Sequence, residues 1–413
     1  MKNNYNIIKE DKFKTNYLNI RFLVEANKEN TTLISLLTIY MVYCNDKHRS
    51  YKAASDYLDT LYGMKFDINT SLKGENIVID FNTSFISSKY LDKTQNYLEK
   101  VIEELLTYIY KPLQNNNLFD DETFNLRKYD LAERIKAAYD DKTSYAFEKY
   151  FETFAKNYPL ALNESGYLKQ LENIEKEDIQ SIHKKLIKQT PIISGIVSSQ
   201  DYDIILKLLE NTIPVQNYKE SFKFYNINKT TTTQEIIDSQ QIVQSKLLLG
   251  FSTKNKLQKE DYHKVLIFNA IFGMGSNSYL FKIVREKENL CYTIRAMYEQ
   301  YSNSLTVMSG IERKNYQKTA TLIQDILTQI KNGEFSDQDL QDAKIVMSDV
   351  INKTNDSQAG LVMYKVNRLM QDLTTDLNQD LEQINKVNRE DIIKIANLFE
   401  LKTIYLLSGD KNE

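Results

Sequence analysis

The feature that most constrains the fold is a long internal repeat, because the chain runs twice through one order of predicted elements. Two short segments mark the register of the repeat: residues 119–122 (FDDE) and residues 335–338 (FSDQ). Each is typical of a helix N-cap followed by acidic first-turn residues. The leading residues, Phe119 and Phe335, are 335 − 119 = 216 positions apart. Such a spacing indicates two copies of one domain.

Each half contains a strand, two helices, a strand pair and a long helix before the capped helix, and then closes with a helix and a strand. Alternating apolar and polar residues predict the strands, and apolar residues at helical spacing predict the helices. In the first half these elements are predicted at 17–24, 32–43, 51–61, 64–72, 76–85, 91–110, 121–139, 179–187 and 192–197. In the second half they are predicted at 245–251, 259–272, 278–286, 289–298, 304–311, 316–331, 337–350, 391–398 and 403–407.

This pattern predicts an α+β fold of two homologous domains, each an antiparallel β-sheet with helices packed on one face. The domains are expected at residues 1–210 and 241–413. The polar stretch 211–240, which contains Pro214 and a run of threonines, is the expected linker. On pattern alone, two unrelated α+β domains could also share this order by chance.

Charge and composition exclude several classes of function. The chain has 53 basic and 56 acidic residues, interspersed, so no nucleic-acid partner is expected. The polar N-terminus lacks the apolar run of a secretory signal, and the longest apolar stretch, 33–44, is too short to span a membrane. Cys44 and Cys291 are the only cysteines and cannot form a disulfide framework. We therefore expect a cytoplasmic protein without a membrane partner, and the Lys-, Asn-, Ile- and Tyr-rich composition without Trp indicates a bacterial source.

One local phrase connects the repeat to a known family. Residues 280–292 (LFKIVREKENLCY) resemble the Leu-Phe-x-x-x-Arg-Glu-Lys-x-Gly-Leu-Ala-Tyr phrase of the insulinase/pitrilysin zinc peptidases, which carry an inverzincin motif. The phrase departs from the family at Asn289, in place of Gly, and at Cys291, in place of Ala. Residues 119–122 and 135–142 (IKAAYDDK) add to the likeness, which covers nearly the whole chain. The chain is similar to the non-catalytic, YfmF-like members of the family, and this resemblance implies the duplicated fold predicted above.

The metal motif of the active members is absent. They carry H-x-x-E-H on the first apolar helix, because two His at i and i+4 share a helix face and bind one Zn²⁺, while the Glu acts as general base. Leu36 and Tyr40 stand at the two His positions, and neither is a zinc ligand. None of the three histidines has a second His within a helical turn. Glu133 lies near the position of the family's third ligand, but without the histidines the better interpretation is an ordinary helix carboxylate that faces Arg or Lys neighbours. We predict no metal, no cofactor and no catalytic residue in this chain.

Arg285 and Tyr292 are the candidate substrate-binding residues. In the family, an Arg and a Tyr of the C-terminal domain hold the substrate backbone, and these two residues match them with the same interval of seven. A guanidinium and a phenol can both donate hydrogen bonds to a peptide carbonyl, and the phenol can support a developing oxyanion. Alternatively, they are a surface Arg near a helix C-terminus and a Tyr packed in a strand.

The resemblance therefore implies a catalytically inactive subunit of a heterodimeric zinc metallopeptidase. Its expected partner is a homologous subunit of the YmfH type, which bears H-x-x-E-H and the zinc, and its expected ligand is a peptide substrate. A homodimer is also possible. The alternative is a purely structural scaffold derived from a peptidase, with no substrate to hold. A zinc-independent or alternatively ligated peptidase is the third possibility.

Overall fold

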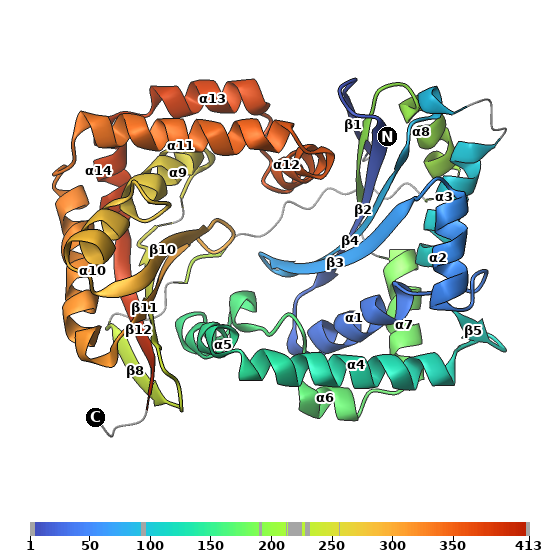
Figure 1. Ribbon diagram of the computed structural model, residues 1–413, viewed down its shortest axis with the longest axis horizontal. Coiled ribbons are helices and arrows are strands. Elements are labelled where there is room, and N and C mark those ends of the chain that lie inside the picture. Colours follow the sequence, from blue (N-terminus) through green and yellow to red (C-terminus); the bar gives the residue numbers. More distant parts are fainter. Residues whose placement is uncertain are drawn as a thin grey trace. The chain divides into compact units, whose positions relative to one another are not determined.

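The computed structural model describes residues 5–91, 96–189, 192–211, 213, 225–227, 232–255 and 257–409 (Figure 1). The chain forms two compact units that do not follow the sequence continuously. Unit 1 comprises Met1–Ala138, Leu162–Phe222 and Thr354–Asp372. Unit 2 comprises Tyr139–Ala161, Lys223–Lys353 and Leu373–Glu413. Each half of the sequence thus contributes one segment to the unit formed mainly by the other half.

Unit 1 is built on a five-stranded sheet with the order β1-β7-β2-β4-β3. Its strands are β1 (Tyr5–Lys9), β2 (Thr15–Glu25), β3 (Lys65–Lys73), β4 (Asn76–Ile86) and β7 (Ile192–Ser198). Only the edge pair β1–β7 is parallel. Leu18, Ile20 and Phe22 alternate along β2 and are fully buried in the main core of the unit, where helices cover the sheet. The helices are α1 (Lys28–Met41), α2 (Tyr51–Thr60), α3 (Tyr97–Tyr110), α4 (Asp121–Asp140), α6 (Leu168–Glu172), α7 (Lys176–Gln189) and α8 (Tyr202–Glu210). A small hairpin, β5 (Gln114–Asn115) and β6 (Leu118–Phe119), precedes α4.

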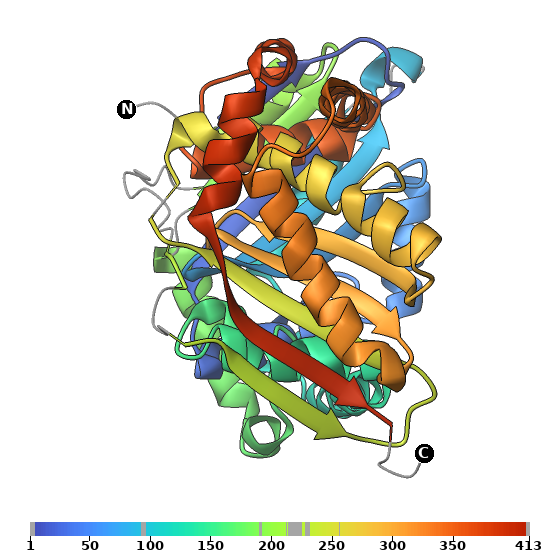
Figure 2. The same ribbon diagram turned by 90° about the vertical axis from the view of Figure 1, so that its left-hand side faces the viewer.

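Unit 2 repeats this sheet, and its strands read β8-β12-β9-β11-β10 from the equivalent edge. They are β8 (Gln234–Ser239), β9 (Ser245–Thr253), β10 (Cys291–Glu299), β11 (Ser304–Ile311) and β12 (Phe399–Ser408). The edge pair β8–β12 is again parallel, and Figure 2 shows these two strands side by side. The helices are α9 (Tyr262–Phe272), the π-helical segment η4 (Leu280–Lys287), α10 (Tyr316–Lys331), α11 (Asp337–Asn355), α13 (Leu377–Lys386) and α14 (Arg389–Leu398).

The two sheets therefore have the same strand order, with β1, β7, β2, β4 and β3 corresponding to β8, β12, β9, β11 and β10. Phe119 and Phe335 directly precede the corresponding helices α4 and α11, and both are buried. The predicted α+β fold of two homologous domains is confirmed. The edge strands β1 and β8 were not predicted, and β8 lies within the stretch 211–240 that was expected to be a linker. Most of the rest of that stretch lies outside the described residues.

Each sheet carries a further helix on its second face, in addition to the helix layer that the sequence predicts. In unit 1 this helix is α12 (Gln358–Met370), which packs on β7 and β2, with α3 on the other side of the sheet (Figure 1). A Cβ at Gly195 of β7 would lie 2.6 Å from Cγ1 of Val362, so the close approach of α12 requires glycine there.

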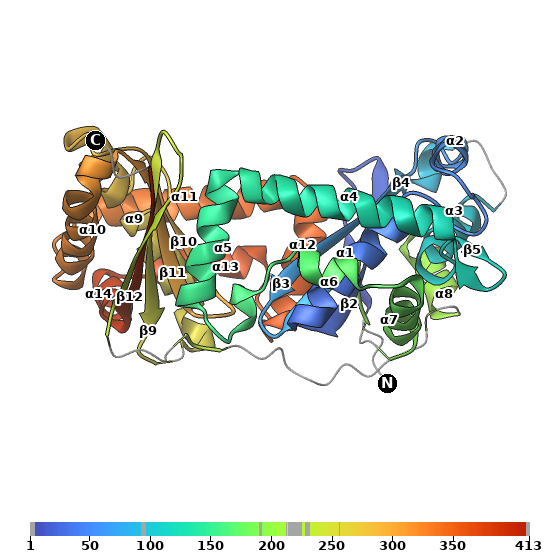
Figure 3. The ribbon, with the colours of Figure 1, turned by 90° about the horizontal axis from the view of Figure 1, so that it is seen from below.

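In unit 2 the corresponding helix is α5 (Lys142–Phe154), which packs on β9 and β12. Figure 3 shows α5 on one side of this sheet and α10 and α14 on the other. Tyr150 and Phe154 of α5 lie against Gly250 of β9, where any Cβ would clash with the hydroxyl of Tyr150 and the ring of Phe154. Because α5 and α12 come from opposite halves of the sequence, the two units exchange one helix each.

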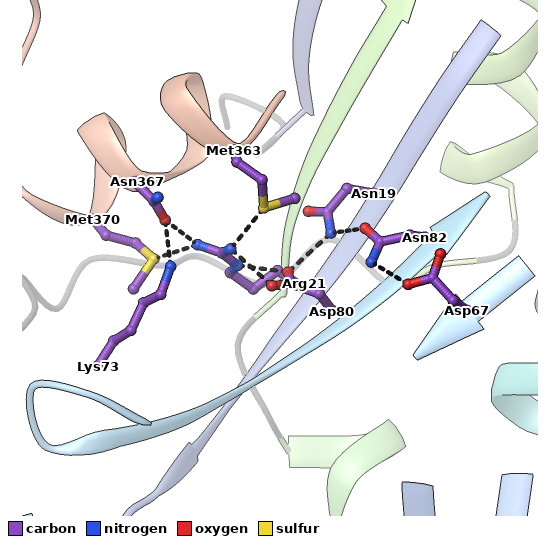
Figure 4. A network of polar contacts seen from close by, with 9 residues as sticks. All are labelled: Asn19, Arg21, Asp67, Lys73, Asp80, Asn82, Met363, Asn367 and Met370. Atoms are coloured by element: carbon purple, nitrogen blue, oxygen red, sulfur yellow. Dashed lines mark hydrogen bonds and ion pairs between the residues drawn. The ribbon is translucent and has the colours of Figure 1, made fainter. Parts of the chain in front are cut away.

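The face of β2 and β4 under α12 has a polar centre (Figure 4). Arg21 of β2 is completely buried, and its Nε and Nη2 donate to the two carboxylate oxygens of Asp80 of β4 at 2.7 and 2.8 Å. Nη1 of Arg21 donates to Oδ1 of Asn367 of α12 at 2.8 Å, and Lys73 donates to the same oxygen. The thioether of Met370 accepts a further contact from Nη1. A buried ion pair thus forms part of the contact between the exchanged helix and the sheet.

Within the described part of the chain, no helix has the length and apolar character that crossing a membrane requires.

Candidate functional site

Helix α1 carries the positions at which the family places its first two metal ligands. It begins after Asn27, whose side chain accepts from the backbone N–H of Asn30 at 2.8 Å and so caps the helix. Leu36 and Tyr40 lie one turn apart on α1 and are both completely buried. Leu36 packs in the main core of unit 1 and has no atom that could bind a metal.

Tyr40 has a structural role. Its hydroxyl donates to the carbonyl oxygen of Leu113 at 2.6 Å and accepts from the backbone N–H of Asp120 at 2.7 Å. Its ring stacks on Phe119 with 4.5 Å between the ring centroids. Burial raises the pKa of the phenol, so the side chain stays neutral. Tyr40 therefore ties α1 to the hairpin before α4, at the position where an active member needs a histidine.

The other candidate ligands do not come together. Glu133 lies on the exposed side of α4 and forms an ion pair with Lys136 at 2.8 Å. Each histidine has a different neighbour: His48 lies 3.3 Å from the carboxylate of Glu104, Nε2 of His183 lies 2.8 Å from the carbonyl oxygen of Ile109, and Nε2 of His263 lies 2.9 Å from Asp380. Burial lowers the pKa of His183.

No cluster of three or more His, Cys, Asp or Glu side chains suitable for a metal occurs among the described residues. The residues present do not fit the zinc of the family, whose catalytic site needs three converging protein ligands. Leu36 and Tyr40 supply none of them.

Arg285 and Tyr292, in contrast, lie together in one cavity of unit 2, which we call the Arg285 pocket. Its volume is about 450 Å³. It is lined by Phe281, Arg285, Glu286, Asn289, Leu290, Cys291, Tyr292, Glu312 and Asn315. The pocket thus contains most of the C-terminal part of the phrase on which the resemblance rests.

A β-bulge presents Tyr292 to solvent. Cys291 pairs with Ile311 and Thr293 pairs with Gly310, so Tyr292 is an extra residue in the edge strand β10. Bulges bend a strand and redirect a side chain, and they are common next to functional sites. Tyr292 is 63% exposed, and Thr293 after it is exposed as well, so the bulge interrupts the alternation of buried and exposed residues at this point of the strand. Its hydroxyl is thereby available to a ligand.

The helical segment η4 presents Arg285. Leu280 and Val284 are buried and fix this segment to the core, whereas Arg285 is exposed on its other side. The N–H of Glu288 donates to the carbonyl oxygen of Ile283, a bond across five residues that is characteristic of a π-helix. Segments of this kind are rare and frequently occur at functional sites.

The two departures from the family phrase preserve the geometry. Asn289 ends the helical segment with φ at +51°, a left-handed conformation that favours Gly and that Asn tolerates better than most residues. Cys291 is buried, and burial raises the pKa of its thiol, so it acts as a small apolar residue. Both substitutions are therefore compatible with the presentation of Arg285 and Tyr292.

Asp339 of α11 anchors the start of η4. Its carboxylate accepts from Lys282 at 3.1 Å, from the hydroxyl of Tyr279 at 3.0 Å, and from the backbone N–H and hydroxyl of Ser336. Burial alone would raise its pKa, but these hydrogen bonds outweigh that effect and lower the pKa to about 2. The ionised carboxylate is therefore stabilised in the folded state.

Asp339→Asn should lower the free energy of unfolding by about 1–2 kcal/mol at neutral pH, since a depressed pKa is a stability contribution. This contribution is present above the ordinary Asp pKa near 4 and is lost as the pH falls towards about 2. The difference between the variant and the unmodified chain should therefore narrow over that range. Urea unfolding followed by circular dichroism at several pH values measures it. Asp349→Asn, at an exposed position of the same helix, is the matched control. Equal stability of the two variants at pH 7 would contradict the anchoring role.

Comparisons with known proteins agree with the fold and with the missing metal motif. The family model of the peptidase M16 inactive domain matches residues 173–347. The probable inactive metalloprotease YmfF of Bacillus subtilis is 29% identical over 98% of this chain and 95% of its own length. An uncharacterized zinc protease, YmxG, of the same organism is 22% identical over 75% of this chain and 74% of its own length.

Among solved structures, a conserved protein from Enterococcus faecalis superposes with a TM-score of 0.91 at 24% identity, over 99% of this chain and 97% of that chain. The non-catalytic members called YfmF-like above therefore correspond to the relative named YmfF.

Proposed function

The chain belongs to the insulinase/pitrilysin (M16) peptidases as a member without the metal motif, and we propose that it is the substrate-holding subunit of a two-subunit zinc metallopeptidase. A non-catalytic role in a peptidase-derived protein follows from its relationship to inactive homologues. The proposal adds a peptide ligand in the Arg285 pocket and a partner subunit that carries the zinc.

The observation that carries the proposal is the contrast between the two candidate sites. The ligand positions of α1 are filled by completely buried side chains that serve the core. Arg285 and Tyr292 are exposed in one pocket, Tyr292 on a bulge and Arg285 on a π-helical segment. The side chains of Arg285 and Tyr292 are both exposed and add little to the core, so a purely structural scaffold would gain little from them. Their donors suit the carbonyl oxygen of a peptide, including one on which negative charge develops.

The partner in this proposal is a homologous subunit that bears H-x-x-E-H. Bacillus subtilis contains both a probable inactive relative and a relative named as a zinc protease, so the two kinds of chain coexist in one organism. Zinc in the partner would supply the metal-bound water, while this chain would contribute only substrate contacts. Cys44 and Cys291 are both free and buried, which is compatible with the cytoplasm as the compartment of the pair.

The purified chain should therefore contain no stoichiometric zinc and cleave no peptide. Peptidase activity should appear only when an H-x-x-E-H homologue from the same genome is co-expressed and co-purified with the chain. Elemental analysis and a peptidase assay with a mixture of short unfolded peptides measure both properties. A partner in which the motif Glu is replaced by Gln is the matched control, because it should assemble without activity.

One tightly held zinc per chain together with chelator-sensitive cleavage by the chain alone would overturn the proposal. A stable complex in which the partner cleaves peptides equally well without this chain would favour the scaffold instead.

A further inference from the structure

The guanidinium of Arg285 lies against an aromatic ring. Within the described part of the chain, Arg285 forms no ion pair. Its guanidinium carbon lies 4.5 Å from the ring centroid of Phe281, one turn earlier on η4. At an exposed site such a cation–π contact favours the ordered side chain about two- to fivefold.

Other charges in the pocket would compete for an unrestrained guanidinium. Glu286 and Glu312 both line the Arg285 pocket, and Glu312 already pairs with Lys314 at 2.6 Å. An arginine free to move would be attracted to either carboxylate, and its donors would then be occupied. A guanidinium over an aromatic ring uses its face for that contact and keeps its in-plane N–H groups available. The ring of Phe281 thus competes with the carboxylates without consuming donors.

The backbone that carries Phe281 is fixed independently of its ring. Leu280 and Val284 are buried, and Lys282 forms an ion pair with Asp339 at 3.1 Å. Phe281 itself is half-buried and lines the pocket. Removing the ring should therefore release the Arg285 side chain more than it disturbs the segment.

We propose that Phe281 is the positioning residue of this site, which holds Arg285 over its ring so that the guanidinium donors face a bound peptide. The inference rests on the proposed function, in which Arg285 holds the substrate. It assigns to Phe281 no contact with the substrate. Phe281 instead reduces the conformational entropy that the long Arg285 side chain loses on binding, because the side chain is already ordered in the free protein.

The first test is made on the chain alone and does not depend on activity. In the unmodified chain, ring currents of Phe281 should shift the Nε–H resonance of Arg285 upfield in a ¹H–¹⁵N spectrum. The shift should be lost in Phe281→Leu and kept in Phe281→Tyr. An identical Arg285 resonance in all three proteins would overturn the contact on which the inference rests.

The second test is a double-mutant cycle on the complex with the H-x-x-E-H subunit. Phe281→Leu should lower kcat/KM about two- to fivefold, the equivalent of the cation–π contact, and Phe281→Tyr should restore it. In the Arg285→Ala background, Phe281→Leu should have no further effect, because the two residues act as one unit. A merely structural Phe281 would instead lower the melting temperature and reduce turnover equally in both backgrounds.

The outcomes separate the two proposals. If Arg285→Ala leaves kcat/KM unchanged, the substrate-holding function fails. If Arg285→Ala is damaging but Phe281→Leu is neutral, or its effect is independent of Arg285, only the positioning role fails. Should Phe281→Leu fold poorly, Phe281→Met, which conserves volume, takes its place in the cycle.

Discussion

Replacement of Arg285 by Ala, or of Tyr292 by Phe, should lower peptide turnover by the assembled pair about 10²–10³-fold, while folding and assembly remain nearly unchanged. Loss of one donor to a developing oxyanion typically has this effect, equivalent to about 3–4 kcal/mol. Both side chains are exposed in the pocket, and Tyr292→Phe removes only a hydroxyl, so neither change leaves a cavity in the core. Steady-state kcat/KM of the complex, measured beside its melting temperature, gives the result.

The chain offers a matched control for each variant. Arg295 lies on the same strand as Tyr292, is exposed and does not line the pocket, so Arg295→Ala should retain full turnover. Tyr129 of α4 is 63% exposed, as is Tyr292, so Tyr129→Phe controls for loss of a surface hydroxyl. If the pocket variants are stable and turn over normally, the substrate-holding role is lost. A lower melting temperature or weaker assembly, with normal turnover per complex, would instead support the structural scaffold.

The repeated elements could be predicted from the sequence because their signals are local. The alternation in β2, the capping segments at Phe119 and Phe335, and the apolar stripe of α10 each depend on residues within a few turns or a few strand positions. The exchange of α5 and α12 could not be predicted. An amphipathic helix has to bury its apolar face, but the sequence of the helix does not show against which sheet it packs. The signal that existed was Gly195 and Gly250, since a glycine inside a strand indicates close approach of another element.

The resemblance to the family, and not residue type alone, placed Arg285 and Tyr292 as a pair. Both line one pocket, and their role in holding a substrate stays a prediction. The bulge at Tyr292 and the π-helical segment were missed, because each inserts one residue into a regular pattern and single-residue shifts are not visible in periodicity. Phe281 and Asp339 were missed as well, since their roles depend on contacts of their side chains with Arg285 and with Lys282. Glu133, which the resemblance placed near a ligand position, is an exposed residue of a surface ion pair.

Asp80→Ala should destabilise unit 1 by about 3–5 kcal/mol, because it leaves the buried Arg21 guanidinium without its carboxylate. Arg21 is 0% exposed, so water cannot replace the two lost hydrogen bonds. The remaining acceptors, Asn367, Met370 and Met363, are neutral and belong to α12. The cost should therefore appear first as loosened docking of α12. Hydrogen exchange measured by mass spectrometry on peptides from β2, β4 and α12 reports this unit separately from unit 2.

For this ion pair, the stability lost when one partner is removed differs from the net stability that the intact pair contributes. The attraction between two buried charges offsets only part of the free energy lost when both are removed from water. Replacing both by apolar residues of similar volume is therefore often neutral or stabilising. The double variant Arg21→Met/Asp80→Leu should therefore recover most of the stability lost in Asp80→Ala. Asp67→Ala, on the neighbouring strand β3, is the control and should have a much smaller effect, because Asp67 has no arginine partner among the described residues. If the double variant is as unstable as Asp80→Ala, the ion pair makes a net contribution to docking α12, and the exchanged helix depends on Arg21 for its placement.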